Sequence, residues 1–294
     1  MALIYRIAHR TEYVYEQPVT SSYGQLRMLP RDIAGQRRRS AVIAVEPTPE
    51  LLRERVDFFG NRVSYFATHR QHLVLSVSAN SEVEVDDRRE RLSLFGESGW
   101  ERTRDLVAAG GEQIPDDVLQ YVLDSPRVPL DPCYREYAAQ SFAPGAGVIE
   151  ALASLSSRIH ADFAYAPGTT SVATPLIEAF AARRGVCQDF AHVAIACLRS
   201  LGIPARYVSG YLETDPPPGR PKLTGADGSH AWLSAFVPGA GWVDLDPTND
   251  QFVAARHIVT AVGRDYSDVA PMNGVIYTQG RTERLTVEVD VVAL

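Results

Sequence analysis

The residue in this sequence that is best placed for nucleophilic chemistry is Cys187, in the run Gly-Val-Cys-Gln-Asp from residue 185 to residue 189. The apolar spacing after Cys187 predicts a helix that begins near this residue and ends at Gly202. A glycine just before a helix lets the backbone turn sharply and leaves the cysteine at the helix N-terminus. Free N–H groups and the helix dipole there favour a thiolate and can hold an oxyanion. Cys197 lies on the apolar face of the same helix, and we expect it to be a small buried hydrophobe.

A thiol that cleaves amides also needs a base, and His230 is the best candidate among the seven histidines. It begins a predicted strand, in the run Gly-Ser-His-Ala-Trp, beside a long Pro/Gly-rich loop. His192 is the main competitor by sequence distance, but five residues along a helix turn it about 140° away from Cys187. The alternative for His230 is a surface histidine without a catalytic role, so the choice depends on a partner acid.

The segment 241–248 supplies that acid. A Pro-Gly-Ala-Gly turn at 238–241 folds the segment back along the strand 230–237 as a hairpin, so an acid near its end returns beside His230. Such an acid orients the imidazole and stabilises its charged form. The residues alone leave three candidates open: Asp244, Asp246 and Asp250.

The register of this hairpin decides whether Asp246 can reach the histidine. If Val237 paired with Trp242, Asp246 would lie opposite Leu233 and on the other face of the sheet from His230, because side chains alternate along a strand. We therefore predict a bulge or a different loop length, which brings Asp246 opposite His230 or Trp232.

Changes in the spacing of apolar and polar residues divide the chain into three parts. Residues 1–100 alternate between apolar and polar side chains and predict a β-rich N-terminal domain with antiparallel strands. Residues 101–147 have helical spacing interrupted by prolines and predict a helical connecting segment. Residues 148–294 predict a catalytic core, in which helices precede antiparallel strands, followed by a C-terminal strand at 284–292. This order is typical of an α+β fold.

Two further elements are expected to frame the site. Helices are predicted at 148–160 and 175–183, the second with Thr174 as its N-cap and Pro175 in its first turn. The loop from Asp215 to Gly228 leads to the strand that begins with His230, and we expect it either to control substrate access or to act as a simple connector.

Composition excludes several classes of protein. The hydrophobic content of 45% and the charged content of 22% are those of a globular protein, and a net charge of −7 argues against nucleic-acid binding. The sequence has neither the apolar stretch of a membrane helix nor that of a signal peptide, so we expect a cytoplasmic protein without a membrane partner. Its three cysteines indicate neither a disulfide framework nor a zinc site, and we expect no cofactor and no metal.

Four motifs in this order resemble the core of the transglutaminase-like superfamily. They are the Cys187 run, Gly-Ile-Pro-Ala-Arg-Tyr-Val-Ser-Gly-Tyr at 202–211, His-Ala-Trp at 230–232, and Gly-Trp-Val-Asp-Leu-Asp-Pro-Thr at 241–248. The resemblance covers residues 148 to 260 and is strongest to the bacterial transglutaminase-like cysteine proteases. The opening residues, with Leu-Arg-Met-Leu-Pro-Arg at 26–31, resemble the β-rich region usually attached to that core.

This resemblance implies a papain-like α+β fold and a catalytic triad of Cys187, His230 and Asp246. The family pattern of a tryptophan followed four residues later by the acid favours Asp246 over Asp244. The animal enzymes place a tryptophan after the cysteine and another upstream, whereas this chain has Gln188 and, upstream, Phe163 and Tyr165. The oxyanion is therefore expected at the Cys187 backbone N–H, with Tyr165 as a further donor. The chain offers no dense acidic cluster for the calcium sites of the animal enzymes.

The residues expected to support the triad are Tyr165, Gln188, Trp232 and Trp242. The implied activity is attack on a peptide or protein amide through an acyl-enzyme. Water as the second nucleophile gives a cysteine peptidase or amidase, which we favour, and a primary amine gives a transglutaminase. A binding or scaffold protein that keeps the fold without turnover is the third possibility.

Overall fold

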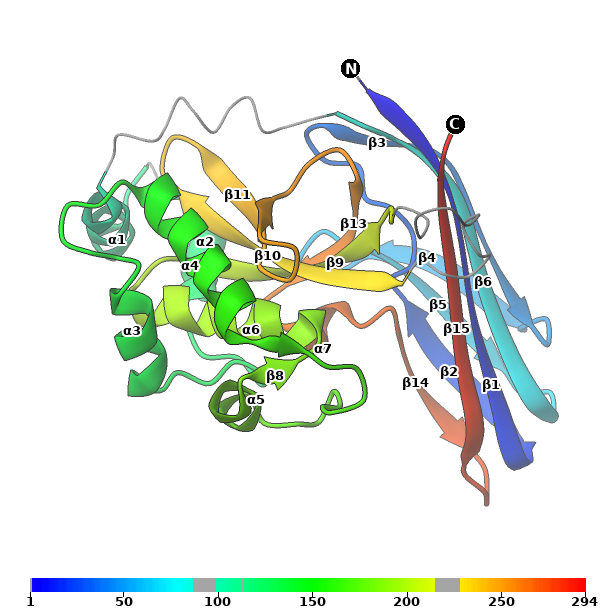
Figure 1. The fold of residues 1–294 in the computed structure, drawn as a ribbon. Helices are drawn as coiled ribbons and strands as arrows, with labels where there is room; N and C mark the ends of the chain where they lie inside the picture. The colour runs from blue at the N-terminus through cyan, green and yellow to red at the C-terminus, as the bar shows by residue number, and fades with distance from the viewer. Residues whose placement is uncertain (1, 87–98, 113, 215–227) are drawn as a thin grey trace, which may run out of the picture.

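The protein is described by a computed structural model that covers residues 2–86, 99–112, 114–214 and 228–294 (Figure 1). The loop expected to control substrate access lies outside these residues, apart from Gly228. Within the described ranges, no helix has the length and apolarity that crossing a membrane requires. The architecture is α+β, as the sequence predicts: β-strands in the N-terminal half, then helices packed on an antiparallel sheet.

The N-terminal half forms a sandwich of two four-stranded antiparallel sheets (Figure 1). The first sheet has the order β15-β1-β6-β3 and the second the order β14-β2-β5-β4. Their bounds are β1 (Leu3–Val19), β2 (Ser21–Leu26), β3 (Gln36–Glu46), β4 (Leu51–Val56), β5 (Arg62–Thr68), β6 (His72–Val85), β14 (Met272–Tyr277) and β15 (Thr282–Ala293). Buried side chains from both sheets, among them Tyr15, Phe66 and Leu75, form the core between them.

The C-terminal strands complete the N-terminal sheets. β15 pairs with β1 over most of its length and β14 pairs with β2. The strand predicted at 284–292 is therefore present, and it returns to a sheet formed by the first residues of the chain. The predicted domain boundaries at residues 100 and 147 stay a prediction. Strands β14 and β15, however, lie in the sheets of the N-terminal half.

The middle of the chain builds a helical layer on a five-stranded sheet. The helices are α1 (Trp100–Ala109), α2 (Asp116–Leu119), the 3₁₀ turn η2 (Gln120–Val122), α3 (Pro132–Ala139), α4 (Val148–Asp162), α5 (Leu176–Ala182), α6 (Cys187–Ser200) and α7 (Tyr266–Val269). The sheet has the order β12-β11-β10-β9-β13, with β9 (Ala205–Leu212), β10 (Ser229–Val237), β11 (Gly241–Asp246), β12 (Gln251–Phe252) and β13 (His257–Gly263). A short parallel pair, β7 (Ala164–Tyr165) and β8 (Arg184–Gly185), lies before α6.

The predicted helices are present, with one correction at a helix start. The second begins one residue later than expected: Pro175 is its N-cap, and the Thr174 hydroxyl accepts the Ser171 N–H instead of capping the helix. The third helix begins at Cys187, as predicted.

The five-stranded sheet lies between the helices and the sandwich (Figure 1). One face packs on α6 through a large apolar core that includes Phe190, Ile195 and Leu233. The other face contacts the sandwich, where Tyr211 and Ile258 pack against Ile7 of β1. The two halves therefore share buried surface, which holds the N-terminal sandwich against the strands that carry the candidate site.

Two side-chain amides join the sandwich to the edge strand β13. Gln36 exchanges hydrogen bonds with the backbone of Val259, donating at 2.9 Å and accepting at 2.8 Å. Asn61 does the same with Val262, at 2.8 Å in each direction. Both amides are buried. Because an edge strand has unpaired backbone groups, these amides stand in for a further strand and fix the two halves in register.

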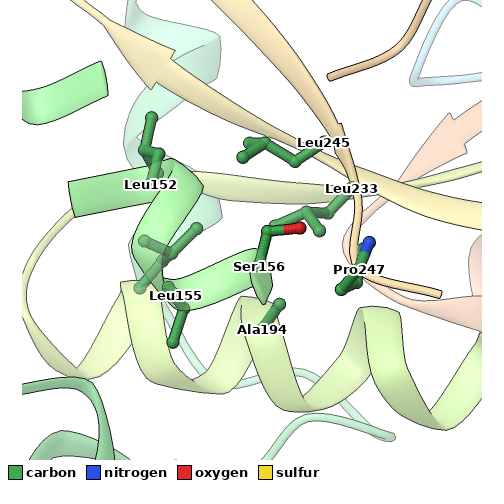
Figure 2. A pocket seen from close by; sticks show the side chains of 8 residues that line it. Leu152, Leu155, Ser156, Ala194, Leu233, Leu245 and Pro247 are labelled. Carbon is green, nitrogen blue, oxygen red and sulfur yellow. The ribbon is translucent and has the colours of Figure 1, made fainter. Parts of the chain in front are cut away.

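A small apolar cavity lies between α4, α6 and the β10–β11 hairpin (Figure 2). Its lining includes Leu155, Ser156, Leu233 and Pro247, and its volume is about 10 Å³. The Ser156 hydroxyl is buried and, within the described part of the chain, has no hydrogen-bond partner. This volume holds about one water molecule and no peptide, so the cavity is a packing feature under the residue that follows Asp246.

Buried histidines are expected to make the fold sensitive to acid. Burial lowers the pKa of His9, which contacts the Tyr211 hydroxyl at 2.8 Å, to about 4, and that of His192 to about 3. Since both values lie below the ordinary 6.5, the unfolded chain binds protons first as the pH falls. The contribution of these two histidines to the free energy of unfolding should therefore be complete above pH 6.5 and should fall between pH 6.5 and pH 4, by up to about 3 kcal/mol from His9 alone.

Urea unfolding at pH 7.5 and pH 4.5 measures this loss. A His9→Gln variant cannot take up the proton, so its stability should decrease less over the same interval. An equal decrease in the variant and the wild type would show that His9 does not contribute.

Candidate active site

Cys187 is the first residue of α6, and the segment before it is fixed by a carboxylate. The Asp189 side chain accepts the Val186 N–H at 2.8 Å and the Thr170 hydroxyl at 2.7 Å. A Cβ on Gly185 would lie 2.4 Å from that carboxylate, so glycine is needed there. Because the first N–H groups of a helix have no acceptor within the helix, those of Cys187 and Gln188 are available to a ligand.

His230 lies near the start of β10, on the face that the Trp232 ring also occupies. It pairs with Gly210 of β9, and its ring stacks on Trp232 with a centroid distance of 6.0 Å. The ring is mostly buried, with 11% of the side chain exposed. Its Nε2 contacts Asp246 Oδ2 at 2.8 Å. Cys187 lies near enough to the ring to raise the pKa of His230. Since Nε2 is occupied, Nδ1 is the nitrogen left for the thiol.

The hairpin register brings Asp246 to the correct face. Val237 pairs with Gly241 and Leu233 with Leu245, so the next position places Asp246 opposite Trp232. This is one of the two registers that the sequence predicts, and it results from a turn one residue shorter than the Val237–Trp242 pairing would give. Asp244 lies on the same face but nearer the turn, where it accepts a hydrogen bond from Ser234.

The Asp246 carboxylate is buried and accepts hydrogen bonds at both oxygens. Oδ1 accepts the backbone N–H groups of Thr248 at 3.1 Å and Asn249 at 3.3 Å. Oδ2 accepts the Asn249 amide at 2.7 Å and also contacts Nε2 of His257 at 3.1 Å, in addition to His230. A carboxylate accepts hydrogen bonds in this number only when it is ionised.

Charge on this group of side chains is strongly stabilised. Burial disfavours the charged His230 ring, but hydrogen bonds to Asp246 and Cys187 outweigh burial and raise the pKa of His230 to about 10. Burial also disfavours an ionised Asp246, but hydrogen bonds from His230 and His257 hold the pKa of its carboxyl well below the usual range. At neutral pH the pair is therefore an imidazolium and a carboxylate.

Two family matches cover most of the chain. Residues 5–84 match the bacterial transglutaminase-like N-terminal region, and residues 135–247 match the transglutaminase-like superfamily. The second match contains Cys187, His230 and Asp246. The chain belongs to the transglutaminase-like superfamily.

Relatives that match almost the whole chain occur in mycobacteria. An uncharacterized protein of Mycobacterium tuberculosis is 42% identical over 98% of this chain and 92% of its own length. An uncharacterized protein of Mycobacterium leprae is 35% identical over 98% of both chains. A protein-glutamine gamma-glutamyltransferase of Pseudomonas aeruginosa is 39% identical over 24% of this chain and 10% of its own length.

A solved structure confirms the fold of this transglutaminase-like protein. A Cytophaga hutchinsonii protein described as a proposed cysteine protease matches with a TM-score of 0.76, over 100% of this chain and 91% of that chain. Its sequence identity is 20%, so the likeness concerns the fold and not the activity.

Of the other residues expected at the site, Tyr165 and Gln188 lie near Cys187. Tyr165 is 55% exposed, and its ring contacts Phe190 edge to face. Burial and then the nearby Cys187 raise the pKa of Tyr165, so its hydroxyl stays a hydrogen-bond donor at neutral pH. Gln188 is partly buried and directly follows the cysteine.

The two tryptophans differ in position. Trp232 is buried behind His230, and a Cβ on Gly210 would lie 2.5 Å from it, so β9 passes close over the indole ring. Trp242 pairs with Phe236 near the hairpin turn, where the Arg206 guanidinium lies 4.0 Å from its ring centroid. Trp242 therefore lies at the opposite end of β10 from His230, and its expected support of the site stays a prediction.

Two residues at Asp246 were not predicted from the sequence. Asn249 follows the aspartate in an Asp-Pro-Thr-Asn turn, a pattern that signals a side chain folding back on the backbone. His257 lies on β13, which is separated from β10 by β9, and no local pattern connects it with Asp246. A contact across the sheet of this kind depends on tertiary structure.

The other two cysteines are references against which the reactivity of Cys187 can be measured. Cys197 is fully buried on α6, and burial raises the pKa of its thiol far above the usual range. Cys133 is partly exposed on α3; burial, together with a hydrogen bond to Asp131, raises the pKa of its thiol to about 11.

The site also contains a group of potential metal ligands. His230, Asp246 and His257 each offer an atom, and these atoms lie within 4.8 Å of one another. However, the two contacts with Asp246 Oδ2, at 2.8 and 3.1 Å, are hydrogen-bond distances, and a nitrogen that donates its proton cannot also bind a metal.

We therefore expect dialysis against EDTA to leave the alkylation rate of Cys187 within about twofold of the untreated protein. Mass spectrometry of the alkylated peptide measures this rate. Loss of reactivity that added Zn²⁺ restores would instead identify a resident metal.

Proposed function

We propose that this protein is a thiol-dependent amide-bond enzyme, most simply a cysteine peptidase or amidase, acting through Cys187, His230 and Asp246. The observation that supports the proposal is the His230 ring, which contacts Asp246 through Nε2 at 2.8 Å and whose pKa is raised by Asp246 and the nearby Cys187. A nucleophile, a base and an orienting acid in contact are the requirements for covalent acyl transfer.

In the proposed first step, the Cys187 thiolate attacks the carbonyl carbon of a peptide amide. The S–C bond forms as the carbonyl electron pair moves to oxygen, and the N–H groups of Cys187 and Gln188 stabilise the oxyanion. His230 then gives its Nδ1 proton to the leaving nitrogen as the C–N bond breaks. The amine leaves and a thioester remains on Cys187.

In the second step, His230 removes a proton from water, and the water oxygen attacks the thioester. The C–S bond breaks, the acid is released, and the thiolate–imidazolium pair is restored. Asp246 keeps its charge throughout and holds the ring in the same orientation.

A transglutaminase is the second candidate, since the same thioester can react with a primary amine in place of water. Its support is the short match to the Pseudomonas protein-glutamine gamma-glutamyltransferase. Both candidates require a peptide or protein amide as substrate.

The test is incubation of the protein with peptide libraries, with and without a fluorescent primary amine, followed by mass spectrometry. Hydrolysed peptides that depend on Cys187 support the peptidase or amidase, and Cys187-dependent incorporation of the amine supports the transferase. A Cys187→Ala variant is the matched control. Products that form equally in the variant, or the absence of products together with an unreactive Cys187, would favour the scaffold protein.

A further inference from the structure

His257 lies behind the candidate active site, at the start of β13. Its ring is 2% exposed and packs against Trp232 edge to face, with a centroid distance of 5.2 Å. It is the second histidine to contact the carboxylate of Asp246, and it contacts the same oxygen that His230 does.

The geometry defines the tautomer of this ring. Nε2 lies 3.1 Å from Asp246 Oδ2, whereas Nδ1 is buried and has no hydrogen-bond partner among the residues that the structure describes. An ionised carboxylate only accepts hydrogen bonds, so the proton must be on Nε2. A second proton on Nδ1 would be a buried donor without an acceptor, which is costly. His257 is therefore a neutral donor to Asp246.

Space filling alone does not explain this arrangement. A leucine of similar size would fill the position without leaving a buried nitrogen unpaired. The histidine directs its single donor at the oxygen that His230 uses, so its polar contact serves the His230–Asp246 pair.

We infer that His257 is a positioning residue that shares the Asp246 carboxylate with His230. This inference rests on the proposed function. By donating to Oδ2, His257 takes up part of the negative charge and helps to fix the carboxylate that His230 contacts. His230 consequently holds its proton less firmly than it would against an otherwise free carboxylate, which helps it release that proton to the leaving amine.

Two variants distinguish the effect of the His257 hydrogen-bond donor from the effect of its side-chain volume. His257→Leu keeps much of the volume and removes the donor, whereas His257→Gln keeps an amide N–H that can reach the carboxylate. The titratable groups around His230 are otherwise unchanged: Asp246 on β11 and Cys187 on α6. Thermal unfolding first establishes that both variants fold.

The measurement is the titration of the His230 ring by nitrogen–proton NMR, assigned with a His230→Gln variant. In His257→Leu the midpoint should rise by about half a pH unit or more, because Asp246 retains more charge for His230. In His257→Gln it should stay within about 0.2 units of the wild type. Where a peptide substrate is identified, turnover should fall about tenfold in His257→Leu and no more than about threefold in His257→Gln.

Identical His230 midpoints in the wild type and the leucine variant, or an equal shift in both variants, would overturn the inference. Such a result leaves the proposed function intact if wild-type Cys187 is reactive and peptides are turned over. Conversely, an unreactive wild-type Cys187 contradicts the proposed function without any change in the His230 titration.

Discussion

Replacing His230 with glutamine is expected to reduce turnover of a peptide substrate roughly ten-thousand-fold. Glutamine fits the space and can still contact Asp246, but it can neither accept the thiol proton nor protonate the leaving amine. Substrate binding should change little, because the His230 side chain is mostly buried. Initial rates over a range of substrate concentrations measure the loss, which should appear in kcat and not in KM.

The matched control is His69→Gln, which changes an exposed histidine of the sandwich loop. Its rate should equal that of the wild type. A His230→Gln enzyme with more than about a tenth of wild-type turnover would mean that another group serves as the base.

Replacing Gly210 with alanine is expected to destabilise the protein by about 2–4 kcal/mol and to displace Trp232 from His230. A Cβ at this position would lie 2.1 Å from the Ile258 carbonyl oxygen and 2.5 Å from the Trp232 ring. The carbonyl belongs to the neighbouring strand β13, so the backbone itself must move. Urea unfolding measures the stability, and Cys187 alkylation reports the damage to the site.

Gly228→Ala provides the comparison, since no atom of the described residues lies within 4 Å of a Cβ there. It is two residues from His230, yet its stability should stay within about 0.5 kcal/mol of the wild type. If Gly210→Ala lowered the free energy of unfolding no more than Gly228→Ala does, this result would contradict the close approach of β9, β13 and Trp232.

The parts of the site that lie in one continuous segment could be predicted from the sequence. Glycine before an amphipathic run predicts the helix that begins at Cys187, and the alternation of residues in a hairpin restricts the register of Asp246 to two choices. The structure has one of these, with Asp246 opposite Trp232. Both inferences depend on local geometry, which spacing along the chain determines.

Contacts between distant segments could not be predicted in this way. His257 reaches Asp246 only because β13 pairs with β9, and β15 joins the first sheet only because it pairs with β1. Alternation predicted β15 as a strand but did not identify its neighbour. Trp242 shows the converse. It lies only four residues before Asp246 in the sequence, but it is next to the hairpin turn and therefore far from His230.

The central claim is that His230 and the start of α6 make Cys187 a reactive nucleophile, and selective alkylation tests it most directly. After brief treatment with iodoacetamide near pH 6, mass spectrometry should find the label on Cys187 at a rate at least about ten times that of Cys133 and Cys197. His230→Gln should reduce this preference. Equal labelling of the three cysteines, or an unlabelled Cys187 in the folded protein, would contradict the claim.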